Sequence, residues 1–72
     1  MDIEVYQNGS YVTTFYDIPD SADAVLDFLC DFCSNEGYSI GNQERKELAE
    51  SAQELLAGGE ILLCGFEMRR DD

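Results

Sequence analysis

Apolar and polar residues alternate on both sides of an Asn8-Gly9 pair near the start of the chain. Asn-Gly favours the two positive φ angles of a two-residue type I′ turn, so residues 3–18 are predicted to form a β-hairpin. The simplest register pairs Val5 with Val12 and Tyr6 with Tyr11. One face then carries Ile3, Val5, Val12, Tyr16 and Ile18, and the other carries Tyr6, Tyr11, Thr13 and Phe15.

Two later segments repeat apolar residues at helical spacing. The first helix is predicted over residues 20–35, with Asp20 or Ser21 as its N-cap and Gly37 after its end. Its apolar stripe consists of Val25, Leu26, Leu29, Phe32 and Cys33. The second helix is expected to begin at Asn42, as its N-cap, and to end at Gly58-Gly59. Its apolar side consists of Leu48, Ala52, Leu55 and Leu56.

A last apolar segment, Ile61 to Met68, has apolar residues on both of its faces. This pattern is typical of a central strand, so we predict a third strand there. The expected fold is α+β with the order ββααβ, in which two helices cover one face of a three-stranded sheet. We expect residues 1–72 to form a single compact domain and residues 69–72 to be a frayed tail.

Charge sets this chain apart from an average small domain. It has 16 acidic residues, 4 basic residues and no histidine, which gives a formal net charge of −12. Residues 1–36 contain neither Lys nor Arg. Such a charge repels free nucleic acid and anionic membranes, so neither is expected as a direct partner. A hydrophobic content of 44% is too high for a disordered acidic tail, and the chain is expected to fold around a core.

The first predicted helix carries a row of aspartates, spaced three, four and four residues apart. Its members are Asp20, Asp23, Asp27 and Asp31. At helical geometry they project from one side over roughly 16 Å, and like charges at these spacings destabilise a helix. One interpretation is that the row imitates nucleic-acid phosphates and meets the basic surface of a nucleic-acid-binding protein. The other is an ordinary solvated helix face.

The outer face of the predicted hairpin places three aromatic residues together. Tyr6, Tyr11 and Phe15 are candidate anchors for a protein partner, because clustered exposed aromatics are typical of interfaces. Alternatively, they only stabilise one another across the strands. Whether the chain is a monomer, or a dimer through this face, stays open.

The cysteines have the spacing of a redox or zinc motif at Cys30 and Cys33. Both lie in the middle of a helix among carboxylates, which disfavours a reactive thiolate, and only Cys64 remains as a further thiol ligand. We therefore expect buried thiols that pack as small hydrophobic groups, with no metal and no cofactor. Without a histidine base, a nucleophile elbow or a phosphate-binding loop, no catalytic residue is assigned and we expect no enzyme activity.

The opening residues give an expectation about location. The first four residues have neither the basic nor the apolar part of a secretory signal, and no segment approaches about 20 apolar residues. An odd number of cysteines is also unusual for a disulfide-stabilised secreted domain. We expect a cytoplasmic protein without a membrane anchor, in the cytoplasm of a host cell if a phage encodes it.

The segment Ile3-Glu4-Val5-Tyr6-Gln7-Asn8-Gly9-Ser10 resembles the first hairpin of some small phage-encoded anti-CRISPR proteins. The length, the acidity and the helix-plus-sheet plan are similar as well. The resemblance implies an inhibitor that binds a Cas protein or surveillance complex. Several such proteins occupy a basic DNA-binding surface with carboxylates, although the choice of the four aspartates here comes from charge alone.

The expected function is therefore an acidic inhibitor that binds a CRISPR effector, or another nucleic-acid-processing complex, and blocks its nucleic-acid-binding surface. A small adaptor or antitoxin-like subunit that binds a protein through the aromatic hairpin is the alternative.

Overall fold

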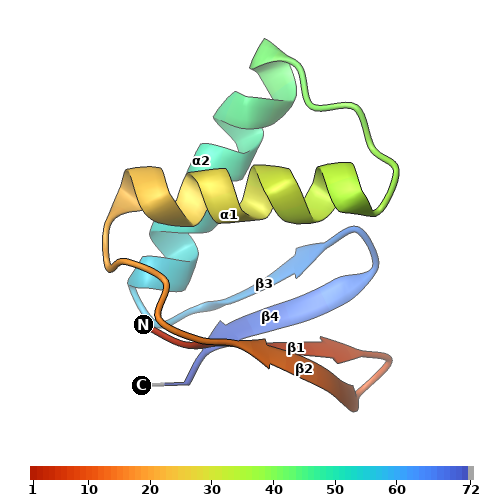
Figure 1. The fold of residues 1–72 in the computed structure, drawn as a ribbon, viewed down its shortest axis with the longest axis vertical. Coiled ribbons are helices and arrows are strands. Elements are labelled where there is room, and N and C mark those ends of the chain that lie inside the picture. Colours follow the sequence, from red (N-terminus) through yellow and green to blue (C-terminus); the bar gives the residue numbers. More distant parts are fainter. Residues whose placement is uncertain (72) are drawn as a thin grey trace.

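The computed structural model describes residues 1–71, which form two helices on one face of a four-stranded antiparallel sheet (Figure 1). Its elements in chain order are β1 (Ile3–Gln7), β2 (Ser10–Phe15), α1 (Ala22–Asn35), α2 (Asn42–Leu56), β3 (Glu60–Leu63) and β4 (Phe66–Arg70). The order of strands across the sheet is β2-β1-β4-β3. The α+β class with both helices on one side is confirmed, whereas the predicted ββααβ order is wrong because a fourth strand is present.

The first hairpin turns at the predicted residues but contains a bulge. Asn8 and Gly9 have φ angles of 53° and 81°, as a type I′ turn requires. The pairing of Tyr6 with Tyr11 is confirmed, but Val5 pairs with Thr13. The predicted pairing of Val5 with Val12 is therefore wrong. Val12 is the extra residue of a β-bulge, which shifts the rest of β2 by one position.

This shift reverses the face of every later residue in β2, because side chains alternate along a strand. Phe15 pairs with Ile3 and turns toward the helices, so its predicted position on the outer face is wrong. Its ring lies 4.9 Å from that of Phe28 and 6.1 Å from that of Phe32. Tyr16, which was expected on the core face, is instead 69% exposed.

The predicted third strand is in fact a second hairpin. β3 and β4 are joined at Cys64-Gly65, whose φ angles of 54° and 82° nearly repeat those of the first turn. The apolar residues on both faces had suggested a central strand, but β3 lies at the edge of the sheet and its Leu62 is 73% exposed. A glycine inside an apparent strand is a known sign of such an interruption.

The chain's first and last strands lie side by side at the centre of the sheet, where β1 pairs with β4. Arg69 and Arg70 belong to β4, so the predicted frayed tail does not begin at residue 69. The backbone N–H of Asp71 still donates to the carbonyl of Asp2 at 3.0 Å. Asp72, the end of the predicted tail, lies outside the described residues.

Both helices begin and end close to the predicted residues. Ser21 is the N-cap of α1, and its hydroxyl accepts from the Ala24 N–H at 3.2 Å. Gly41, one residue earlier than predicted, precedes α2 as its N-cap, and its N–H donates to Oε1 of Glu44. The helices and the inner face of the sheet enclose one core, made of Ile3, Val5, Val25, Leu29, Cys33, Leu48, Ala52, Leu55, Ile61 and Met68.

Candidate partner-binding surfaces

The row of aspartates predicted from the sequence is on the surface of the folded protein. Asp20 lies just before the N-cap of α1, and the other three lie within the helix. All four are exposed. We call Asp20, Asp23, Asp27 and Asp31 the acidic stripe.

Two members of the acidic stripe are held by arginines from distant parts of the chain. Nη2 of Arg70 lies 2.8 Å from Oδ2 of Asp20, and Nη2 of Arg45 lies 2.8 Å from Oδ1 of Asp27. The hydrogen bond to Asp27 is the largest of the effects that raise the pKa of Arg45. Among the described residues, Asp23 and Asp31 have no ion pair. Along the stripe, carboxylates with an ion pair therefore alternate with carboxylates that have none among the described residues.

The sequence offered no local signal for these pairs, because the partners lie 50 and 18 residues away. Arg70 also donates from Nη1 to the carbonyl of Leu56 at 2.9 Å, at the end of α2. It thus joins β4 to the beginning of α1 and to the end of α2. A cation at this position also compensates the negative end of the α2 dipole, whose last turn has no basic residue.

The second candidate surface is the sheet face that points away from the helices (Figure 1). By strand pairing, two rows of side chains cross it, one in the order Tyr11, Tyr6, Glu67 and Leu62, the other in the order Thr14, Glu4, Arg69 and Glu60. We call these eight residues the open face. Of the three predicted aromatic anchors, the structure places Tyr6 and Tyr11 on it and Phe15 behind it.

Contacts between side chains order the middle of the open face. The guanidinium carbon of Arg69 lies 4.8 Å above the centre of the Tyr6 ring, and Arg69 also donates to Glu4 at 3.1 Å and to the Tyr6 hydroxyl at 2.9 Å. The Tyr6 and Tyr11 rings meet edge to face at 5.7 Å. Tyr11 is nevertheless 58% exposed. These are partly exposed aromatic groups, held by side-chain contacts, of the kind that anchors protein interfaces.

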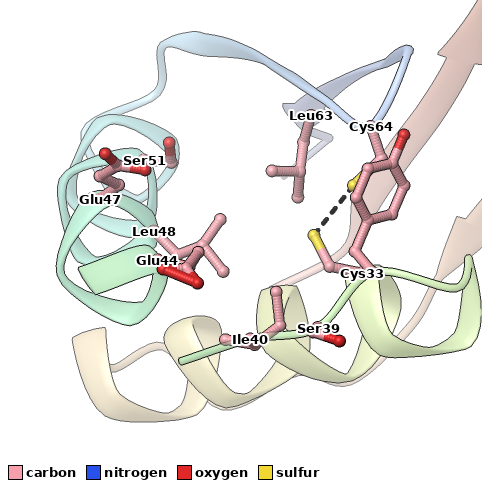
Figure 2. Close-up of a pocket in the computed structure, with 10 residues that line it drawn as sticks. Cys33, Ser39, Ile40, Glu44, Glu47, Leu48, Ser51, Leu63 and Cys64 are labelled. Carbon is pink, nitrogen blue, oxygen red and sulfur yellow. Dashed lines mark hydrogen bonds between the residues drawn. The ribbon is translucent and has the colours of Figure 1, made fainter. Parts of the chain in front are cut away.

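A third feature was not predicted: a cavity of about 250 Å³ beside the C-terminal end of α1. Figure 2 shows its walls, which come from the end of α1, the loop before α2, the first turns of α2 and the β3–β4 turn. Its apolar lining includes Ile40, Leu48 and Leu63, and the carboxylates of Glu44 and Glu47 lie on the α2 side.

Two cysteines meet at this cavity. The sulfur of Cys33 lies 3.0 Å from that of Cys64, and no disulfide joins them (Figure 2). Burial, followed by the hydrogen bond and the charge of Cys64, raises the pKa of Cys33 from 9.0 to about 12. Cys33 is buried as expected, but Cys30 and Cys64 are only partly buried. Residues 1–71 contain no cluster of His, Cys, Asp or Glu that would hold a metal ion.

Comparisons with family models, curated proteins and solved structures give no match to this chain. None of the helices in the described part of the chain is long and apolar enough to cross a membrane.

Proposed function

We propose that this protein is an acidic inhibitor that binds a basic surface on a nucleic-acid-processing complex and blocks access of DNA or RNA to that surface. A CRISPR effector is the partner that the sequence resemblance favours. The proposal is carried by one observation: an exposed helix side in which Asp23 and Asp31 have no ion pair within residues 1–71, on a chain of net charge −12.

The geometry supports unequal contributions of the four aspartates of the acidic stripe to partner binding. Asp23 and Asp31 offer their full charge to Lys and Arg of a partner. Asp20 and Asp27 already have arginine partners, so a basic surface must displace or share those cations. Exposed ion pairs are worth about 0–1 kcal/mol, so displacement is possible, but the gain is smaller than for an unpaired carboxylate. Charge attraction of this kind mainly accelerates association and weakens in salt.

The test compares variants that remove equal charge from different surfaces. Asp23→Asn/Asp31→Asn removes the two carboxylates of the stripe that have no ion pair within residues 1–71, and Glu50→Gln/Glu54→Gln is the matched control on the exposed side of α2. Tagged proteins are used to capture partners from host lysate at low and high salt, and the captured complex is then assayed for nucleic-acid binding. We expect the aspartate variant to lose at least ten-fold in inhibitory potency and the glutamate variant to lose less than three-fold.

Equal losses from the two variants would contradict recognition by the acidic stripe. Circular dichroism and thermal unfolding serve as the folding control, and the aspartate variant should fold as well as wild type because it relieves repulsion within α1.

An adaptor that binds a protein through the open face is the second candidate. It is favoured by the exposed Tyr11 and Leu62, which flank the ordered Tyr6–Arg69 pair. The same capture experiment separates the two functions. Binding through the open face resists high salt and survives Asp23→Asn/Asp31→Asn, but is lost in Tyr11→Ala.

A further inference from the structure

We propose that Cys33 and Cys64 are a site of reversible oxidation, at which an intramolecular disulfide fastens the C-terminal end of α1 to the β3–β4 turn. The site depends on neither of the functions proposed above. It is carried by the position of the two sulfurs, by the backbone at Cys64 and by the separate environment of Cys30.

The two sulfurs are already neighbours. They lie 3.0 Å apart in the reduced protein, and a disulfide bond requires about 2.05 Å, so they need to approach by only about 1 Å. Cys33 lies in the last turn of a helix, whereas Cys64 belongs to a surface turn next to the cavity. Cavity space beside both residues allows the small movement that bond formation needs (Figure 2).

The backbone at Cys64 is unusual for this residue type. Its φ of 54° is a left-handed conformation that non-glycine residues adopt at a cost, and Asn is the common choice. The chain itself provides the comparison, since the first hairpin places Asn8 at the equivalent position with a φ of 53°. Turn formation alone therefore does not explain why a cysteine occupies the Asn position. The contact of this cysteine with a second cysteine does.

Cys30 is excluded from this pair by its own contacts. Its sulfur accepts from Nη1 of Arg45 at 3.5 Å, on the side of α1 that faces α2. The Cys-x-x-Cys spacing is thus not the pairing that the fold favours. Cys33 instead contacts a cysteine 31 residues away in the sequence.

The chemistry requires an oxidant, for which we name a low-molecular-weight disulfide such as oxidised glutathione. The partly buried Cys64 reacts first: its thiolate attacks one glutathione sulfur and releases glutathione thiolate. The Cys33 thiolate then attacks the Cys64 sulfur and releases the second glutathione. The protein loses two electrons and two protons, and one oxidised glutathione becomes two reduced molecules. Burial, the largest cause of the raised pKa of Cys33, persists in the mixed disulfide, but the smaller contributions of the Cys64 thiol are removed.

Peptide mapping of the wild-type protein identifies the bond directly. After incubation with oxidised glutathione and blocking of the remaining thiols, cleavage before Asp residues and after Lys and Arg separates all three cysteines. The relevant peptides cover residues 27–30, 31–45 and 47–69. We expect peptides 31–45 and 47–69 to be joined, with the blocking group on Cys30. A bond between 27–30 and 31–45, a bond between two molecules, or no bond at all would overturn the proposal.

Variants provide the functional readout. Oxidation closes the loop between Cys33 and Cys64. This should raise the melting temperature by about 10–20 °C, and a reductant should reverse the rise. Cys30→Ser should behave as wild type. Cys33→Ala and Cys64→Asn should show no rise. The Cys64→Asn variant should still fold, because Asn suits this position of the turn. A rise of the same size in Cys64→Asn would also overturn the proposal.

Discussion

At the scale of single residues, the bulge at Val12 decides what each aromatic side chain does. Tyr6 and Tyr11 remain on the open face, whereas Phe15 packs against Phe28 and Phe32. Residues that were grouped as one predicted anchor set therefore have two different roles. Phe15 links β2 to α1 and contributes to stability, and of the three predicted aromatic anchors only the two tyrosines are available to a partner on that face.

This difference predicts opposite results for two alanine substitutions. Phe15→Ala should lower the free energy of unfolding by about 2–4 kcal/mol, because it leaves a void among packed rings. Tyr11→Ala should cost less than about 1 kcal/mol, since the ring is mostly exposed. Urea denaturation followed by circular dichroism measures both. A larger loss for Tyr11→Ala than for Phe15→Ala would show that Phe15 does not face the helices.

At the scale of elements, the side chain of Arg70 joins the end of β4 to the ends of both helices. Arg70 of β4 reaches Asp20 before α1 and the carbonyl of Leu56 at the end of α2. Neither contact follows from helix propensity. Both depend on β4 lying at the centre of the sheet with its last residues next to the two helix ends.

We expect Arg70→Ala to lower the free energy of unfolding by about 1–3 kcal/mol, because a charged hydrogen bond to a partly buried carbonyl is lost together with an ion pair. Arg70→Lys should lose about half as much, since an ammonium group lacks the fork that spans two acceptors. Lys46→Ala, on the exposed side of α2, is the control and should change stability by less than about 0.5 kcal/mol. Thermal unfolding of the four proteins in one buffer ranks them.

At the scale of the whole molecule, the carboxylates of residues 1–71 are confined to a body of 29 × 25 × 18 Å. The Debye length is about 30 Å at 0.01 M salt, so at that concentration every charge interacts with every other. The net effect in a chain of charge −12 is repulsion, which destabilises the compact state.

Added salt should therefore stabilise the protein. At 1 M salt the Debye length is about 3 Å, which screens the repulsion while close ion pairs lose little. We expect the melting temperature to rise by several degrees between these two concentrations, with NaCl and KCl giving the same result. A fall in melting temperature would mean that the three described ion pairs, rather than repulsion, dominate the electrostatic energy.

The sequence by itself determined the features that depend on neighbouring residues. Ser21, one of the two predicted N-caps, and Gly37 delimit α1, Gly58-Gly59 follows α2, and Asn8-Gly9 forms a turn, because capping and turn preferences act over a few positions. Amphipathic spacing was sufficient for the α+β class and for placing both helices on one face. The net charge is likewise a property of composition alone.

Only the tertiary structure decided the rest, because it depends on contacts between residues far apart in the chain. The bulged register turns Phe15 inward against α1, and β4 pairs with β1 at the centre of the sheet whereas β3 lies at its edge. The same long-range contacts neutralised half of the acidic stripe and brought Cys33 to Cys64. Local propensities do not include such contacts. The surfaces that are open to a partner could therefore be identified only from the folded chain.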